Sequence, residues 1–270
     1  MKINPEYVTR LISTFIKEEL AKFDFRKAIL GLSGGLDSSV CAFLATRALG
    51  SHNVLALIMP YGKTFPEEVE DAQTVAALVG CRVLIIDIQP MVEAYFSIYP
   101  TDDPVLKGNK MARERMAILY DFSAREKALI LGTSNKTELL IGYGTIHGDL
   151  ACGINPLGDL YKTQIRQLAD WLGVPEKIRK KKPTAGLWPG QTDEEEIGLS
   201  YDELDSILYE LVDLRKSRLE LISQGYDPQK VNRVWEMMRR SEFKRRMPPI
   251  LKLSSRTVGH DFLYPYDWDR

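Results

Sequence analysis

The sequence predicts an α/β fold of the Rossmann-like, doubly wound type, with a parallel sheet of about five strands and helices on both faces. Short, continuously apolar runs alternate with helix-length segments along the first half of the chain. Strands that are apolar at successive positions are typical of a parallel sheet covered on both sides. One such run leads into a glycine loop and an amphipathic stretch, which is the strand, loop and helix unit of nucleotide-binding sheets.

Each predicted element follows from its own pattern. Apolar side chains at helical spacing predict an opening helix over residues 5–21. The short apolar runs predict strands, and the segments between them have the length and spacing of helices. The predicted strands are residues 28–32, 54–59, 83–88 and 128–133, and helices are predicted at residues 67–79 and 111–125.

Length and composition fit one large α/β domain over residues 1–270, since 44% of the residues are apolar and can form a substantial core. A net charge of −1 gives no overall attraction to nucleic acid or to membranes, so neither partner is expected. No apolar run approaches the roughly 20 residues of a membrane span, and we predict a cytoplasmic location. The 3 cysteines and 3 histidines are scattered, which predicts neither disulfides nor zinc.

The loop of residues 33–38, Ser-Gly-Gly-Leu-Asp-Ser, carries the strongest functional signal. It aims backbone N–H groups and the positive end of a helix dipole at one point, which favours a phosphate. Ser33, Ser38 and Ser39 add hydroxyl donors, and Asp37 fits an anion site as a ligand of phosphate-bound Mg²⁺. The spacing matches neither Walker A nor the dinucleotide fingerprint. A simple glycine turn capped by serines is the structural alternative.

A second polar cluster, residues 132–138, follows the fourth predicted strand. By itself this cluster is typical of a helix start with capping residues. Carboxyl ends of parallel strands share one edge of the sheet, so the cluster is expected beside the glycine loop. Glu138 would then be a second ligand for Mg²⁺, and Thr133 would face the nucleotide.

The glycine loop resembles that of the ATP pyrophosphatases, which cleave ATP between the α and β phosphates and pass AMP to an acceptor. The rest of the chain, from roughly residue 25 to residue 250, resembles the ammonia-dependent NAD synthetases within that superfamily. The matching segments are residues 142–149, 155–157, 160–164, 182–187, 193–198, 200–205 and 241–246.

The resemblance implies a role for individual residues of this chain. The implied ATP-binding residues are Gly31, Leu32, Ser33, Gly34, Gly35, Leu36, Asp37, Ser38, Thr133, Lys162 and Thr184. The implied metal ligands are Asp37 and Glu138. The implied deamido-NAD-binding residues are Arg113, Asp149, Phe243 and Lys244. The implied catalytic residues are Asp149, Lys162 and Thr184.

The implied reaction is amidation of deamido-NAD by ammonia with ATP and Mg²⁺, through an adenylated intermediate, to give NAD, AMP and pyrophosphate. The chemistry is consistent, because a carboxylate has no good leaving group until it is joined to AMP. The resemblance also implies a homodimer. Only about two dozen residues precede the first strand, so no glutaminase domain is expected in this chain, and a separate glutaminase as the ammonia source stays open.

The chain departs from the family pattern at three positions. Many members have His where this chain has Phe243, Arg where it has Ile58, and Lys where it has Ile146. These differences predict that some contacts to the dinucleotide and to adenine differ in this chain.

Two segments leave structural alternatives open. Residues 180–191 combine charge, prolines and glycines, which favours a lid over ATP, with a solvated linker as the alternative. Apolar positions from residue 204 to residue 214, together with Tyr264, Tyr266 and Trp268, are compatible with either a dimer interface or a core.

Two other functions are compatible with parts of the sequence. Basic clusters at residues 179–182, 239–240 and 244–246 are compatible with a tRNA-modifying ATP pyrophosphatase, but no basic appended domain and no Cys-x-x-Cys pair accompany them. A non-catalytic ATP-sensing module is the other alternative. Such a module has no need for Glu138, Lys162, Thr184 and Asp149 together.

Overall fold

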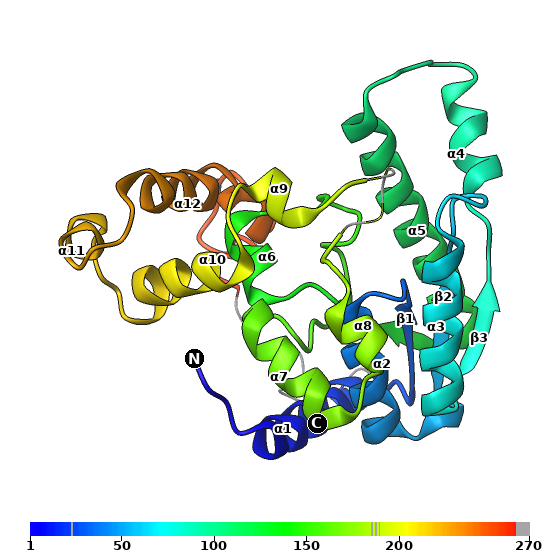
Figure 1. Cartoon of the computed structure of the whole chain (residues 1–270). Coiled ribbons are helices and arrows are strands. Elements are labelled where there is room, and N and C mark those ends of the chain that lie inside the picture. The colour runs from blue at the N-terminus through cyan, green and yellow to red at the C-terminus, as the bar shows by residue number, and fades with distance from the viewer. Residues whose placement is uncertain (23, 185, 187, 189, 263–270) are drawn as a thin grey trace.

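The computed structural model describes residues 1–22, 24–184, 186, 188 and 190–262 (Figure 1). Within these residues a parallel sheet of four strands has the order β3-β2-β1-β4. The α/β fold and the parallel sheet are therefore confirmed. The strands are β1 (Lys27–Gly31), β2 (Val54–Ile58), β3 (Arg82–Ile85) and β4 (Ala128–Ile130).

The predicted count of about five strands is wrong for the described residues. The chain returns beside β4 at Gly153 and Ile154, where Gly153 N donates to Ile130 O at 2.9 Å and Gly132 N donates to Ile154 O at 2.8 Å. This contact is only an isolated bridge between Leu131 and Ile154. Pro156 follows two residues later and has no N–H to continue a ladder, so a fifth strand does not develop.

Helices cover both faces of the sheet, as a doubly wound fold requires (Figure 1). Side chains at successive strand positions enter different clusters: Leu30 packs into the core on one face and Ile29 into the core on the other. The first face is covered by α1 (Pro5–Lys22), α2 (Leu36–Leu49), α3 (Pro66–Val79), α7 (Lys162–Leu172) and α8 (Glu176–Lys180). The second face is covered by α4 (Gln89–Phe96) and α5 (Pro104–Glu126).

Strand β3 departs from the expected burial. Its Leu84 and Ile85 are 38% and 49% exposed, although the apolar run predicted burial on both faces. The reason is that β3 is the outermost strand and pairs only with β2. Helix α5 begins earlier than predicted, because the Asp103 side chain caps it by accepting from Val105 N at 2.8 Å.

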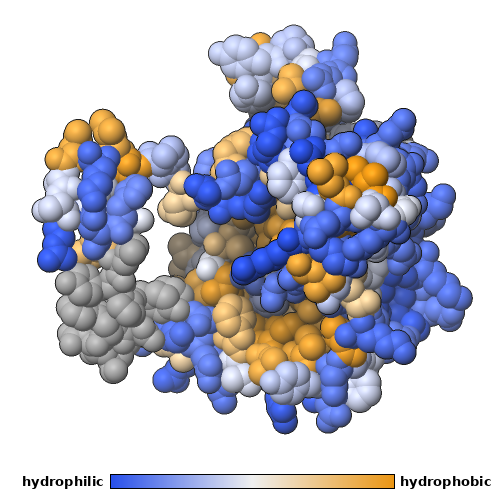
Figure 2. All heavy atoms as spheres, turned by 90° about the vertical axis from the view of Figure 1, so that its left-hand side faces the viewer, coloured by the Kyte–Doolittle hydropathy of each residue, from blue (hydrophilic) through white to orange (hydrophobic). Residues whose placement is uncertain are grey.

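A separate helical cluster, at the left of Figure 1, has its own apolar core. It contains α6 (Lys136–Ile141), α9 (Asp193–Ile197), α10 (Tyr201–Leu208), the π-helix η2 (Tyr209–Asp213), α11 (Arg218–Ser223) and α12 (Pro228–Arg240). Short 3₁₀ helices, η3 (Glu242–Arg245) and η1 (Ser51–Asn53), complete the described elements. Figure 2 shows separate apolar areas among hydrophilic side chains on the face turned to the viewer.

This cluster shows whether the apolar positions from residue 204 to residue 214 form a core or an interface. Leu204, Ile207, Leu208 and Leu211 are buried in its core, so they are not interface residues, while Leu214 is 46% exposed. Tyr264, Tyr266 and Trp268 lie outside the described residues. In the described part of the chain, no helix combines the length and the apolar character that crossing a membrane requires.

Candidate active site

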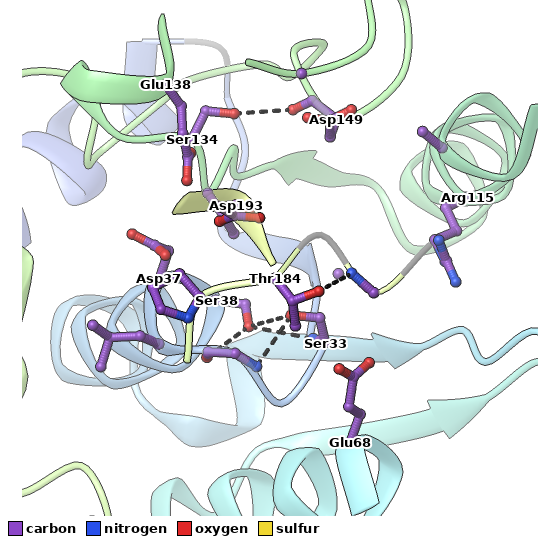
Figure 3. A pocket seen from close by; sticks show the side chains of 18 of the residues that line it. Ser33, Asp37, Ser38, Glu68, Arg115, Ser134, Glu138, Asp149, Thr184 and Asp193 are labelled. Atoms are coloured by element: carbon purple, nitrogen blue, oxygen red, sulfur yellow. Dashed lines mark hydrogen bonds between the residues drawn. The ribbon is translucent and has the colours of Figure 1, made fainter. Parts of the chain in front are cut away.

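A cavity of about 560 Å³ opens at the carboxyl ends of the strands, as expected for a parallel sheet (Figure 3). Its volume is within the range of small-molecule sites. Most of the residues singled out in the sequence line this cavity. They are Gly31, Leu32, Ser33, Gly35, Leu36, Asp37, Ser38, Thr133, Glu138, Asp149, Lys162, Thr184 and Lys244.

The glycine loop forms one wall of the cavity. Gly35 is the N-cap of α2 and provides no side-chain cap, so the dipole end of this 14-residue helix is not neutralised by a capping side chain. Ser33 Oγ accepts from Gly35 N at 3.2 Å and lies 3.0 Å from Ser38 Oγ. The hydroxyls therefore shape the loop, and the helix end can still receive an anion.

Two residues of this loop that the sequence offered for phosphate contact are not among those that line the cavity. Gly34 does not line the cavity: its φ is +80° and an added Cβ would lie 2.3 Å from the backbone oxygen of Glu68. The glycine is therefore needed for close packing against α3. Ser39 is fully buried and donates to Gly35 O at 2.6 Å, so its hydroxyl supports the loop and does not face a ligand.

Asp37, Glu138 and Lys162 meet in the floor of the cavity. The Lys162 Nζ forms an ion pair with Asp37 and lies 3.8 Å from Glu138 Oε1. The three side chains are only 15%, 17% and 5% exposed. The three residues are far apart in the chain: Asp37 and Glu138 follow β1 and β4, and the packing of α7 against α2 brings Lys162 beside them.

Glu138 caps a helix and also lines the cavity, two positions that the sequence offered as alternatives. Its Oε2 accepts from Asn135 N at 3.1 Å in a capping box, while Oε1 faces Lys162. Asn135 also reaches the glycine loop, because its Nδ2 donates to Asp37 Oδ1 at 3.1 Å. The helix cap therefore fixes the carboxylate that the cavity uses.

Burial and charge shift the pKa values in this cluster. Burial, reinforced by the Asp37 carboxylate, raises the pKa of Glu138 to about 8. Burial alone would lower the pKa of Lys162, but the Asp37 and Glu138 carboxylates outweigh it, and the pKa is raised. Lys162 therefore keeps its positive charge beside Asp37 and Glu138.

The cluster fits a Mg²⁺ ion that is held partly by its substrate. Within the described residues no group of three or more His, Cys, Asp or Glu side chains could hold a metal. Mg²⁺ in nucleotide sites is usually held by one or two carboxylates and by substrate phosphates. Asp37 and Glu138 are such a pair, and the Lys162 ammonium already occupies a cationic position between them.

The opposite wall contains Asp149 and Lys244. Asp149 Oδ1 accepts from Thr145 N at 2.9 Å, and Ser134 Oγ donates to Asp149 O at 3.3 Å. Desolvation by the surrounding protein raises the pKa of Asp149, although its side chain is open to the cavity. Lys244 Nζ donates to Gly142 O and Gly144 O at 2.8 Å each, and burial lowers its pKa.

Two expected dinucleotide contacts are not brought to the cavity. Arg113 is exposed on α5, and its Nε donates to Ile146 O at 3.2 Å. Phe243 is 61% exposed on η3. Neither lines the cavity. Among the three positions where this chain departs from the family pattern, Ile58 lines the cavity and packs in the core beside it.

Several cavity residues were not singled out by the sequence analysis, and three of them are charged side chains with shifted pKa values. Figure 3 shows Arg115 and Glu68 toward one end of the cavity, away from Asp37 and Glu138. Burial lowers the pKa of Arg115 and raises that of Glu68. Arg115 lies on the same face of α5 as the buried Met111 and Met116, and an arginine in a buried stripe is a usable sequence signal.

Asp193 is the third residue that was missed. Its carboxylate accepts from Tyr143 Oη and from Tyr201 Oη, both at 3.0 Å, and its N donates to Pro183 O at 3.1 Å. It therefore connects the segment of residues 180–191 to the helical cluster. Burial raises its pKa.

The predicted lid segment borders the cavity. Lys181 Nζ lies 3.3 Å from Asp71 and 3.8 Å from Glu68, and Thr184 Oγ1 accepts from Gly186 N at 3.1 Å. Residues 185, 187 and 189 of this segment lie outside the described residues. Closure over a ligand stays a prediction.

Comparison with known proteins supplies the family. A model of the NAD synthase family matches residues 8–248. The NH(3)-dependent NAD(+) synthetase of Trichlorobacter lovleyi is 48% identical over 270 residues, covering 100% of this chain and 99% of that protein. The corresponding protein of Chlorobium phaeobacteroides is 49% identical over 261 residues, covering 97% of this chain and 94% of that protein.

Solved structures agree. The NMN synthetase of Francisella tularensis is similar with a TM-score of 0.83 and 32% identity, over 93% of this chain and 99% of that chain. The NH3-dependent NAD synthetase of Campylobacter jejuni has a TM-score of 0.80 and 36% identity, over 93% of this chain and 100% of that chain. The chain therefore belongs to the NAD synthase family, and it is an enzyme that forms a carbon–nitrogen bond.

Proposed function

We propose that this chain is an ammonia-dependent NAD synthetase, which converts deamido-NAD, ATP and ammonia to NAD, AMP and pyrophosphate with Mg²⁺. The observation that carries the proposal is the buried group of Asp37, Glu138 and Lys162 in the cavity at the ends of β1 and β4. Two carboxylates and a lysine beside an anion-binding helix end match the needs of ATP. The relatives of this chain carry the same activity in their names.

In the first half of the reaction, the acid group of deamido-NAD attacks the α-phosphorus of ATP and pyrophosphate departs. The glycine loop and the end of α2 bind the phosphates through backbone N–H groups. Lys162 lies close enough to offset charge on the departing pyrophosphate, and Thr184 supplies a hydroxyl from the segment over the cavity. Mg²⁺, held by Asp37 and Glu138, would neutralise phosphate charge when bound.

In the second half, ammonia attacks the adenylated carbonyl and AMP departs. Ammonium has no free electron pair, so one proton must first be removed. Asp149 faces the cavity as a carboxylate, and its raised pKa makes it a better proton acceptor than an ordinary aspartate. We assign to Asp149 the binding of ammonium and the removal of its proton.

We also propose a homodimer. Apolar side chains are exposed along β3, α4 and the beginning of α5, and Val105 of this surface also lines the cavity. A second copy packed there would cover apolar area and complete the open end of the cavity. The exposed residues are Leu84, Ile85, Tyr95, Ile98, Tyr99, Val105 and Leu106. Light scattering after size-exclusion chromatography tests this proposal, and a monomer at micromolar concentration would contradict it.

The decisive experiment measures AMP, pyrophosphate and amide product from purified protein. Deamido-NAD with ATP, Mg²⁺ and ammonium is expected to give NAD and AMP in equal amounts. Release of AMP only with tRNA, or binding of ATP without turnover, would support the rival functions instead. Nicotinic acid mononucleotide should be tested in parallel, because one similar structure is an NMN synthetase. Glutamine in place of ammonium tests the nitrogen source, and cell fractionation tests the predicted cytoplasmic location.

A further inference from the structure

Asp205 is a fully buried carboxylate that the mechanism does not use. It lies on α10 in the helical cluster, and it does not line the cavity. Its Oδ1 accepts from Thr137 Oγ1 at 2.6 Å, and its Oδ2 accepts from Thr163 N at 2.8 Å. A buried charge is costly unless it is hydrogen-bonded, so both bonds are needed to keep it there.

The two partners of Asp205 are sequence neighbours of Glu138 and Lys162. Thr137 precedes Glu138, and Thr163 follows Lys162. The same Thr137 hydroxyl oxygen also accepts from Lys162 N at 3.0 Å. One carboxylate and one hydroxyl therefore join the beginning of α6 to the beginning of α7, at the points from which Glu138 and Lys162 project.

A second carboxylate from the helical cluster bonds the residues that directly precede Thr137 and Lys162 in the sequence. Asp213, in the π-helix η2, accepts from Tyr161 Oη at 2.5 Å and from Lys136 Nζ at 2.9 Å. Its side chain is 31% exposed, whereas Asp205 is completely buried. Asp205 and Asp213 thus both bond the beginnings of α6 and α7, and Asp205 provides the buried contact.

We propose that Asp205 is a positioning residue that sets the distance between Glu138 and Lys162 through Thr137 and the first turn of α7. This inference rests on the proposed function, because it takes Glu138 as a metal ligand and Lys162 as a phosphate contact. It adds a role for α10, whose Asp205 does not line the cavity. Asp205 does not line the cavity, so it is assigned no contact with ATP or the dinucleotide and acts only through Thr137 and Thr163.

The test compares two substitutions of Thr137. Thr137→Val keeps the shape but removes the hydroxyl, which leaves Asp205 and Lys162 N without this partner. Thr137→Ser keeps the hydroxyl. We expect Thr137→Val to lower kcat about tenfold or more, as the loss of an outer contact to a metal site typically does, and Thr137→Ser to stay close to the wild type. The KM for deamido-NAD should change little in both.

A binding measurement separates positioning from stability. Calorimetry with a non-hydrolysable ATP analogue should show weaker binding to Thr137→Val in Mg²⁺, and a much smaller difference in EDTA. Circular dichroism first establishes that each variant is folded at the assay temperature. If Thr137→Val is unfolded, Asp205→Asn tests the carboxylate directly, because the amide keeps the shape but has only one oxygen to accept from Thr137 Oγ1 and Thr163 N.

The results distinguish this inference from the proposed function. If the wild type makes no NAD, the proposed function fails. If the wild type is active and folded Thr137→Val matches Thr137→Ser in kcat and in Mg²⁺-dependent binding, the positioning role of Asp205 is wrong. The double variant Thr137→Val with Asp205→Asn should lose less kcat than the product of the two single losses, because both substitutions act on the hydrogen bond between Thr137 and Asp205.

Discussion

Two groups of three charged residues lie at opposite edges of the same sheet. The exposed triad is Lys27, Arg82 and Glu126, and the buried triad is Asp37, Glu138 and Lys162. The exposed triad lies at the amino ends of β1, β3 and β4, and its side chains are between 22% and 49% exposed. The buried triad lies at the carboxyl ends and is at most 17% exposed.

Burial gives the two central glutamates opposite properties. Hydrogen bonds from Arg82 and then Lys27 lower the pKa of Glu126 to about 2. In the buried triad, burial raises the pKa of Glu138 to about 8. Similar residue types therefore form a surface ion pair at one edge and a buried cluster with an opposite pKa shift at the other, because water is available to one group and largely excluded from the other.

The sharpest test of this difference is the same substitution in both triads. Lys162→Met should reduce NAD formation on the order of 10²- to 10³-fold, because the cation that offsets phosphate charge is lost from a water-poor site. Lys27→Met should leave turnover unchanged. Steady-state assays of both folded variants provide the measurement, and comparable rates would show that the buried triad has no special role.

Asp149→Asn extends the comparison to the far wall of the cavity. This change should lower kcat by on the order of a hundredfold, because the amide cannot accept a proton from ammonium. The affinity for ATP should be unchanged, since Asp149 belongs to the other wall. Unchanged turnover, measured at saturating substrates, would argue against its role as a base.

Phe243→Ala tests a position that the cavity does not include. The ring is 61% exposed, so removing it should change the KM for deamido-NAD by no more than about twofold. Lys244→Met is the matched control, because Lys244 lines the cavity and supports Gly142 and Gly144. A large effect of Phe243→Ala would indicate that a second subunit brings this ring to the substrate.

Glu126→Gln should have the smallest effect. It should lower the free energy of unfolding by about 0.5–1 kcal/mol near pH 7, as expected for a well-formed surface pair, with no loss of activity. The folded-state pKa of Glu126 is depressed to about 2, so its contribution is complete above the unfolded value of about 4.3 and is lost as the pH falls toward 2. Urea unfolding at several pH values measures the difference, which should disappear in acid.

Much of the site was accessible from short sequence patterns. The glycine loop and the Asn135 to Glu138 cap are local features, and their positions after apolar strands predicted that they would meet. Asp205 and Asp193 were not singled out, because an aspartate in a helix ordinarily faces solvent and nothing local marks it as buried. Gly34 and Ser39 were assigned to the ligand because sequence spacing does not show which side of a loop faces the cavity.

The amino-acid sequence by itself determined the α/β class, the succession of strands and helices along the first half of the chain, and the strand, glycine loop and helix unit. These features depend on apolar periodicity and on backbone freedom, which are local properties. Only the tertiary structure decided which charges are buried, because burial depends on segments that are distant in the chain. Lys162 and Asp37 are 125 residues apart, and the packing of α7 against α2 makes them neighbours.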